Sequence, residues 1–405
     1  MANIRKVKII ISGAYGNRNL GDELILVSLL KMIKEYIPNS EIMIFSFNPL
    51  HTMEYYKVSS YSQWPEFLKI NYFKVFWKPI FWKHLYQIVK IIKNCDIFLL
   101  GGGGLFEHEY PGVFFWTSKV LIAQLFKKPT IIYAVGVEPI WNKKILSKLL
   151  LKFIFRKARV ILVRDRISKE NLLKLGIPFN KIGIVGDPVF FLRSEFLRYK
   201  RANHRTACLS ICFSIRPIQY PWRDGTCYLS DRQKQLNRSI AEILDKLIDE
   251  FNAHVYLLPM NIEDDRVILE NIYKTIQTYQ KVTLLEKISL EKLWELFCNF
   301  NLVISMRLHP LIIASILKIP FIGIISHPKI LKFLVEINQP SLGISYKELD
   351  KTLFPYDKIK YVLLNYHILY AEKINSSIQN LCWSTLQLSK ESLQTVIPKQ
   401  LKILY

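Results

Sequence analysis

Short, continuous apolar runs alternate with longer amphipathic segments along most of the chain. Such runs without polar alternation are typical of strands in a parallel sheet, because helices cover both faces of that sheet. Eleven of them occur, at residues 7–12, 41–47, 96–100, 130–134, 160–163, 181–185, 208–215, 254–258, 282–285, 302–305 and 321–325. The alternation occurs twice, so we predict an α/β fold with two Rossmann-like, doubly wound domains.

The domain boundaries follow from a change in composition. Residues 193–206 are polar and basic, and we expect them to be the linker between an N-terminal domain (residues 1–192) and a C-terminal domain (residues 207–355). Residues 356–405 have a mainly helical pattern and are expected to pack back across both domains. A chain of 405 residues is long enough for this arrangement.

Residues 301–330 carry the most concentrated candidate chemistry. Pro310 suits the first position of a helix, which places His309 at or beside the N-cap and Arg307 in the loop before it. Lys329 follows the next strand in the same way. Ligands collect beyond the carboxyl ends of parallel strands, and helix N-termini attract anions, so we expect these three cationic groups to face one crevice. The alternative is a hydrogen-bonded structural histidine and a solvated arginine.

A glycine-rich loop at residues 13–23 follows the first strand and precedes an amphipathic helix. Gly16 and Gly21 permit backbone N–H groups to approach an anion, and Asn19 and Asp22 supply polar side chains. The loop lacks the lysine of a phosphate-binding P-loop, and its spacing is not G-x-G-x-x-G. Asp22 is therefore either a functional carboxylate or an N-cap of the following helix.

Three further loops follow predicted strands. Four consecutive glycines, among them Gly102 and Gly103, imply close approach of the backbone to a ligand or to a neighbouring loop. Arg164 begins a short polar loop, and Asp187 ends the last strand of the first half. Loops carrying Gly, Asp or Arg after successive strands are expected at the functional edge of a doubly wound sheet.

The net charge of +23, from 56 Lys and Arg against 33 Asp and Glu, favours anionic partners. No block of five or more Lys and Arg occurs, so a nucleic-acid partner is not expected. The six cysteines show no metal-ligand spacing, and we predict no metal and no cofactor. The N-terminal apolar run is too short for a signal peptide, which favours a cytoplasmic protein.

Two segments, residues 64–90 and 141–159, interleave aromatic and aliphatic side chains with lysine and arginine. This composition suits helices that lie in an anionic lipid interface and hold the protein at the inner face of the membrane. It equally suits surface helices whose lysine stems cover core aromatics. The composition leaves both interpretations open.

Taken in order, these motifs resemble those of the polysaccharide pyruvyl transferases. The resemblance spans about residues 8–329, and it implies a glycosyltransferase-B-like architecture in which the two Rossmann-like domains face a central cleft. It rests on the G-D-E at Gly21-Asp22-Glu23, the G-G-G-L at residues 102–105, the G-x-x-P at residues 136–139, Arg164-Asp165, Asp187-Pro188, Arg307-Leu308-His309 and Lys329.

The resemblance implies transfer of a pyruvyl group from phosphoenolpyruvate to two hydroxyls of a polysaccharide or lipid-linked sugar, with release of phosphate. Catalysis is then expected from His309 and Asp22, with donor anions held by Arg307, Lys329 and Arg164. The helix dipole is expected to keep His309 neutral. The remaining substrate-binding candidates are Gly16, Asn19, Gly21, Gly102, Gly103 and Asp187.

Two other classes of protein remain as alternatives. A nucleotide-sugar glycosyltransferase shares this fold, but many retaining members carry two glutamates eight residues apart after the equivalent loop. Here the glutamates between Lys318 and Asp350 are Glu336 and Glu348, twelve apart. The more distant alternative is a non-catalytic scaffold of a polysaccharide assembly complex.

Overall fold

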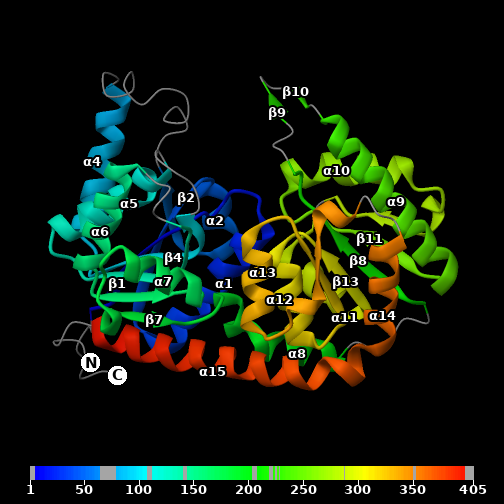
Figure 1. Ribbon diagram of the computed structural model, residues 1–405. Helices are drawn as coiled ribbons and strands as arrows, with labels where there is room; N and C mark the ends of the chain where they lie inside the picture. The colour runs from blue at the N-terminus through cyan, green and yellow to red at the C-terminus, as the bar shows by residue number, and fades with distance from the viewer. Residues whose placement is uncertain are drawn as a thin grey trace. The chain divides into compact units, whose positions relative to one another are not determined.

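The computed structural model describes residues 5–63, 79–106, 112–139, 144–202, 208–218, 222–223, 226–227, 229–286, 288–349 and 353–396. The chain divides into two compact units. Unit 1 comprises Met1–Asn17, Asp22–Phe191 and Trp383–Tyr405, and unit 2 comprises Arg18–Gly21 and Leu192–Cys382. Each unit is an α/β fold with its own parallel sheet, as the alternation of apolar runs predicts (Figure 1).

Unit 1 is built on a seven-stranded sheet of order β3-β2-β1-β4-β5-β6-β7, in which every pair of neighbours is parallel. Its strands are β1 (Val7–Ser12), β2 (Ser40–Ser46), β3 (Ser59–Ser62), β4 (Ile97–Phe106), β5 (Thr130–Val137), β6 (Val160–Val163) and β7 (Ile182–Ile184). Its helical segments are α1 (Leu20–Tyr36), α2 (Pro49–Tyr56), α4 (Pro79–Lys93), α5 (Gly112–Leu125), α6 (Ile145–Lys157), α7 (Arg166–Lys174), η2 (Phe179–Lys181) and η3 (Pro188–Leu192).

The apolar runs form β1 and β6 with the predicted bounds, whereas β4 continues beyond its prediction. The glycines do not follow this strand but lie within it, because the ladder to β5 continues through Gly103, paired with Val135, to Phe106, paired with Val137. The register shifts between those two pairs, and Gly102 and Gly103 have φ of 67° and 87°. Only glycine adopts such angles without strain, so the run makes an irregular extension of the sheet.

Helices α4, α5 and α6 lie over one face of the unit 1 sheet, where α5 packs against both of its neighbours (Figure 1). The core beneath them joins strand residues such as Phe98 and Ile132 to helix residues such as Ile88, Val120 and Ile154, all of them fully or almost fully buried. This packing of apolar strands under amphipathic helices is the main source of stability for such a layer.

Unit 2 has a six-stranded parallel sheet of order β12-β11-β8-β13-β14-β15. Its strands are β8 (Ser210–Ser214), β11 (His254–Leu257), β12 (Val282–Leu284), β13 (Leu302–Ser305), β14 (Phe321–Ile325) and β15 (Gly343–Ser345), and a separate hairpin joins β9 (Trp222–Arg223) to β10 (Thr226–Cys227). Its helical segments are α8 (Arg193–Ala202), α9 (Asp231–Phe251), α10 (Ile262–Thr275), η4 (Tyr279–Lys281), α11 (Leu290–Asn299), α12 (Leu308–Leu317), α13 (Pro328–Glu336), η5 (Pro340–Leu342), η6 (Tyr346–Glu348) and α14 (Leu353–Leu369).

Much of the stretch expected to be a linker is helical. Residues Arg193–Ala202 form α8, which belongs to unit 2 and packs against α11 and α12, with Phe196 fully buried beside Trp294. Residues 203–206 of that expectation lie outside the described part of the chain. A polar helix with one buried aromatic residue has too few apolar positions to stand out in the sequence.

The C-terminal region is helical as far as Val396, and residues 397–405 of the predicted helical region lie outside the described part of the chain. Helix α14 belongs to unit 2, and α15 (Ala371–Val396) contributes its residues up to Cys382 to unit 2 and those from Trp383 to unit 1. Within unit 1, Ser389 Oγ lies 2.6 Å from the hydroxyl of Tyr133, and Thr385 Oγ1 donates to the carbonyl of Val185 at 3.4 Å. Among the described helices, none is long and apolar enough to cross a membrane.

Candidate functional site

The carboxyl edge of the unit 2 sheet gathers most of the predicted donor-binding groups. From β8 the chain proceeds outward to β11 and β12, and it then returns to β13 on the other side of β8. The topological switch point therefore lies between β8 and β13, which is where open α/β sheets bind their ligands. Arg307 and His309 follow β13, and Lys329 follows the neighbouring strand β14.

Helix α12 begins earlier than the sequence predicts. Arg307 is its N-cap and Leu308 its first residue, so His309 is the second and Pro310 the third helical residue. Proline is tolerated throughout the first turn, because the first four N–H groups of a helix have no partner within it. All residues of α12 except His309 are buried, and this packing fixes the position of its first turn.

Arg307 is held by a buried carboxylate that is not among the residues predicted from the sequence. Asp265, in the first turn of α10, is fully buried and accepts hydrogen bonds from Arg307 Nε at 3.0 Å and from Nη2. Its Oδ2 also accepts from the backbone N–H groups of Met260 at 3.0 Å and Asn261 at 2.9 Å. One carboxylate thus orients the guanidinium and fixes the loop that follows β11.

The segment Arg18–Gly21 of the glycine-rich loop packs on that same edge of unit 2. Asn19 forms an antiparallel bridge with Asn261, and Leu20 donates its N–H to the carbonyl of Met260 at 2.8 Å. These backbone bonds place four N-terminal residues beside the loop after β11, more than 200 residues away in the sequence.

Gly21 is in close contact with His309. A Cβ atom built on Gly21 lies 2.0 Å from His309 Nδ1 and 2.6 Å from Cε1, far inside contact distance. Any larger residue at position 21 therefore displaces the imidazole. Asn19 Oδ1 accepts the N–H of Gly21 at 3.0 Å and holds the turn. The structure thereby brings together three predicted site residues, Asn19, Gly21 and His309.

Lys329 lies in the first turn of α13, whose N-cap is His327 and whose first residue is Pro328. The Nδ1 of His327 accepts the N–H of Lys329 at 3.4 Å. As after β13, a proline lies in the first turn of the helix that follows the strand, and a basic residue lies next to it in the sequence. Helices α12 and α13 thus both begin at this edge, and Arg307, His309 and Lys329 lie at their N-termini.

The carboxyl edge of the unit 1 sheet holds the second group of candidates, at its switch point between β1 and β4. Asp22 lies in the first turn of α1 rather than at its N-cap, and its Oδ1 is 3.4 Å from a Cβ built on Gly103. The neighbouring Glu23 is buried and binds the loop, because its Oε1 accepts the N–H of Gly16 at 2.7 Å. Glu23 therefore positions the loop, and Asp22 faces the glycine run.

Arg164 and Asp187 form an ion pair within unit 1. Arg164 Nη1 lies 3.8 Å from Asp187 Oδ2 and its Nε lies 3.9 Å from Asp165 Oδ2, and all three side chains are at least nine-tenths buried. A Cβ built on Gly136 lies 2.9 Å from Arg164 Nη2. The two carboxylates offset the positive charge of the Arg164 guanidinium. A residue that binds a substrate anion through its charge would instead keep that charge uncompensated.

Neither edge has an evident metal site in the described residues, where no group of three or more His, Cys, Asp or Glu converges. Electrostatics at the unit 2 edge centre on the acidic start of α10. Burial, followed by the charge of Asp265, raises the pKa of Asp264, while Arg307 and Arg216 oppose that shift. The arrangement is suited to binding an anion and to proton transfer by an imidazole.

Solved proteins with the same fold include UDP-GlcNAc 2-epimerase from Methanocaldococcus jannaschii, with 13% identity, a TM-score of 0.57, and coverage of 93% of this chain and 99% of that one. A glycosyltransferase from Rickettsia africae matches with 15% identity, a TM-score of 0.60, and coverage of 97% and 98%. At these identities the likeness concerns the fold alone, which is glycosyltransferase-B-like.

The sequence relationship is more specific. The chain is 22% identical over 298 residues to the amylovoran biosynthesis protein AmsJ of Erwinia amylovora, a match that covers 70% of this chain and 69% of AmsJ. The family model of polysaccharide pyruvyl transferase matches residues 19–328. The chain therefore belongs to the polysaccharide pyruvyl transferase family, and its class is that of a transferase in polysaccharide biosynthesis.

Proposed function

We propose that this protein transfers a pyruvyl group from phosphoenolpyruvate to two hydroxyls of one sugar, on a polysaccharide or its lipid-linked precursor. The observation that carries the proposal is the carboxyl edge of unit 2, where two adjacent helix N-termini present Arg307, His309 and Lys329. Phosphoenolpyruvate has a carboxylate and a phosphate, and both require cationic groups or backbone N–H groups. Membership in the pyruvyl transferase family supports the same donor.

The reaction delivers one proton to the methylene carbon and one to the departing phosphate, and it removes one proton from each of the two sugar hydroxyls. Protonation of the methylene carbon gives an oxocarbenium-like centre at the adjacent carbon, which the first sugar hydroxyl attacks. Loss of phosphate gives a second such centre, which the second hydroxyl attacks to close the ketal. His309 is our candidate for the proton transfers, because α12 and Gly21 fix its imidazole in position.

Donor binding falls to Lys329 and to the guanidinium N–H groups of Arg307 that do not bond Asp265. Asp265 orients Arg307 but also offsets part of its charge. Lys329, the other cation proposed to bind phosphoenolpyruvate, does not belong to this ion pair. The N–H groups in the first turns of α12 and α13 complete the anion site. Asn19 and Gly21 act by shaping this edge.

We assign acceptor binding to the carboxyl edge of unit 1. Asp22 beside the irregular glycine run is the candidate to orient the sugar hydroxyls or to remove a proton from one of them. Gly102 and Gly103 allow the backbone to approach the acceptor, and Gly16 is bonded to Glu23. Arg164 and Asp187 are positioning residues, since their buried ion pair supports the β4 and β5 ends near Gly136.

The direct test is release of inorganic phosphate from phosphoenolpyruvate in the presence of candidate lipid-linked sugars. We expect release that depends on both donor and acceptor, together with a rise in melting temperature on addition of phosphoenolpyruvate. A nucleotide sugar that raises the melting temperature while phosphoenolpyruvate does not would instead support a glycosyltransferase. Absence of turnover and of binding with either donor would support the scaffold alternative.

Replacement of Lys329 with methionine is expected to weaken phosphoenolpyruvate binding by about 1.5–3 kcal/mol, the usual range for a hydrogen bond to a charged group. Methionine keeps the apolar part of the side chain and removes only the ammonium. The measurement is a donor titration by calorimetry, with Lys332→Met, one turn later on α13, as the matched control. Equal affinities for the variant and the wild type would remove Lys329 from the donor site.

A further inference from the structure

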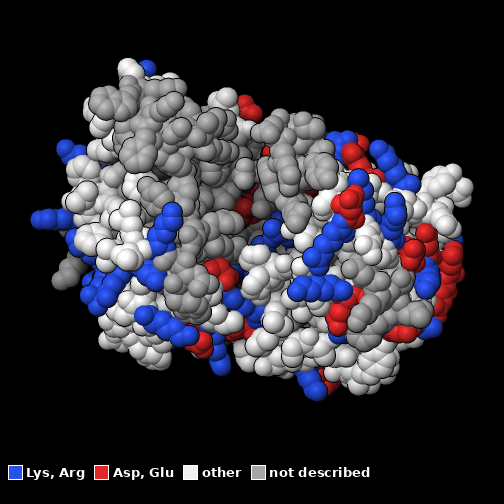
Figure 2. Space-filling model, turned by 45° about the horizontal axis from the view of Figure 1, so that its top comes forward, with Lys and Arg blue, Asp and Glu red and all other residues white. Residues whose placement is uncertain are grey.

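One layer of unit 1 carries basic but no acidic side chains. Within their bounds, α4, α5 and α6 contain no Asp or Glu. Outside the buried Lys119, their cations are Lys83, Lys90, Lys93, Lys148, Lys152, Arg156 and Lys157. By contrast, α9 of unit 2 carries five acidic residues. In Figure 2 the charged side chains on the described surface of unit 1 are mostly blue, whereas red and blue ones are interspersed on unit 2.

The same helices expose large apolar side chains. On α6, Ile145 is 76% exposed, and Leu146, Leu149 and Phe153 are also exposed. On α4, Ile80, Trp82 and Tyr86 are exposed, and Leu125 at the end of α5 is 75% exposed. Isolated exposed apolar residues are normal, but a group on one acid-free layer marks an interaction surface. We call α4, α5 and α6 the basic layer.

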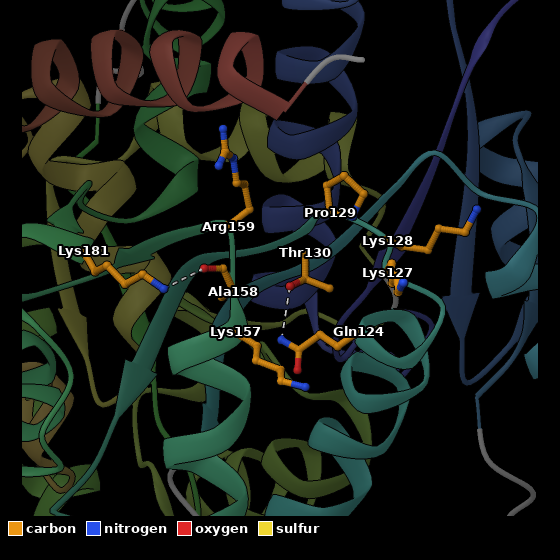
Figure 3. A pocket seen from close by; sticks show the side chains of 9 residues that line it. All are labelled: Gln124, Lys127, Lys128, Pro129, Thr130, Lys157, Ala158, Arg159 and Lys181. Atoms are coloured by element: carbon orange, nitrogen blue, oxygen red, sulfur yellow. Dashed lines mark hydrogen bonds between the residues drawn. The ribbon is translucent and has the colours of Figure 1, made fainter. Parts of the chain in front are cut away.

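The positive surface continues to the amino edge of the sheet, where a hollow of about 460 Å³ is lined by Gln124, Lys127, Lys128, Pro129, Thr130, Lys157, Ala158, Arg159 and Lys181. Figure 3 shows that Arg159, Lys128 and Lys157 point in different directions, and Lys181 Nζ bonds the carbonyl of Ala158 at 3.4 Å. The cations thus do not converge as a clamp for one small anion. They present an extended positive surface.

An anionic lipid bilayer is the partner that matches both features. Exposed Trp, Tyr, Leu and Ile beside lysines are the composition of helices that lie in a lipid interface. A second copy of this layer would bring like charges together, and a nucleic acid would leave the aliphatic side chains of α6 in water. Residues 64–78 and 141–143 of the two predicted segments lie outside the described part of the chain, so α4 and α6 carry the argument.

We propose that the basic layer of unit 1 docks the protein on an anionic membrane surface. The exposed apolar side chains of α4 and α6 enter the headgroup region, and the surrounding lysines and arginines bind anionic headgroups. The attraction is expected to weaken with salt, because the Debye length falls from about 10 Å at 0.1 M to about 3 Å at 1 M.

The test is co-sedimentation of the full chain with phosphatidylcholine vesicles that contain or lack phosphatidylglycerol. We expect binding to the anionic vesicles at low salt and release at 1 M salt. The triple variant Lys152→Gln, Arg156→Gln, Lys157→Gln should partition about 100-fold more weakly, at about fivefold for each cation near the surface. Leu146→Ser with Leu149→Ser should also weaken binding, although the charge is unchanged.

The matched control removes three exposed lysines from unit 2, as Lys234→Gln, Lys274→Gln and Lys292→Gln. This variant should bind the vesicles as the wild type does, and circular dichroism checks that all variants fold. Wild-type protein that stays in the supernatant at low salt, or equal losses in the two triple variants, would overturn the proposal. So would a dimer that the Leu146→Ser and Leu149→Ser changes abolish. The readout is independent of turnover, so its failure is distinct from failure of the proposed function.

Discussion

Replacement of His309 with alanine is expected to lower turnover by about 100-fold or more, the usual loss when a general acid or base is removed. The fold should persist, because the side chain is only partly buried and α12 is held by its apolar residues. The measurement is the rate of phosphate release at saturating phosphoenolpyruvate. His51→Ala, on the exposed surface of α2, is the matched control and should retain full activity.

A second variant tests the position of the imidazole. In Gly21→Ala the new methyl group occupies space 2.0 Å from His309 Nδ1, so the ring has to move while its chemistry is retained. We expect a loss in turnover that approaches the loss in His309→Ala, with a smaller change in donor affinity. Normal turnover in both variants would exclude His309 from the mechanism. Normal turnover in Gly21→Ala alone would show that catalysis does not require the imidazole of His309 to stay in the position seen in the structure.

Replacement of Asp265 with alanine should be among the most damaging single changes in unit 2. It removes the carboxylate that binds Arg307 and two backbone N–H groups, and it leaves the guanidinium, which is only 13% exposed, without its charge partner. Loss of one partner of a buried ion pair costs about 3–5 kcal/mol. Denaturant unfolding measures this loss, and a donor titration of the remaining folded protein should show weaker phosphoenolpyruvate binding.

Asp264→Ala is the control for that experiment, since Asp264 precedes Asp265 on the same helix. Its Oδ2 accepts from the side-chain amide of Asn261 at 3.0 Å, and it makes no ion pair with Arg307. We expect about 1 kcal/mol of destabilisation, the typical value of one hydrogen bond. Similar losses in the two variants would show that Asp265 does not have the special anchoring role assigned here.

The central strands were predictable because their sequences leave little choice. Val7–Ser12, Val160–Val163, Leu302–Ser305 and Phe321–Ile325 are almost entirely apolar, and their predicted bounds match the structure. Strand β3 (Ser59–Ser62) was missed, since its sequence SSYS has no apolar run and it lies at the edge of the sheet. An edge strand packs against one neighbour only and needs fewer apolar residues.

The candidate site was predictable in its residue types but not in its network. Arg307 was identified as a cation at a strand end, whereas its partner Asp265 lies 42 residues earlier in an acidic helix start that resembles ordinary capping. The available signal was topological. Strands β11 and β13 lie on either side of β8 in a parallel sheet, so the loops that follow them lie at the same edge of the sheet. Polar residues in these two loops are therefore expected to lie near one another. The pairing of Arg164 with Asp187 follows from the same geometry after β6 and β7.

The C-terminal part of α15 has a consequence for synthesis of the protein. Its residues Thr385, Ser389 and Leu393 are buried in unit 1, whose last strand, β7, ends at Ile184. About 200 residues are therefore translated between the last strand of that sheet and the helix that covers Tyr133. At the usual 5–20 residues per second this takes about 10–40 s. We expect the surface of unit 1 that this helix covers to stay exposed on the ribosome during that interval, where chaperones that act during translation would be able to bind it.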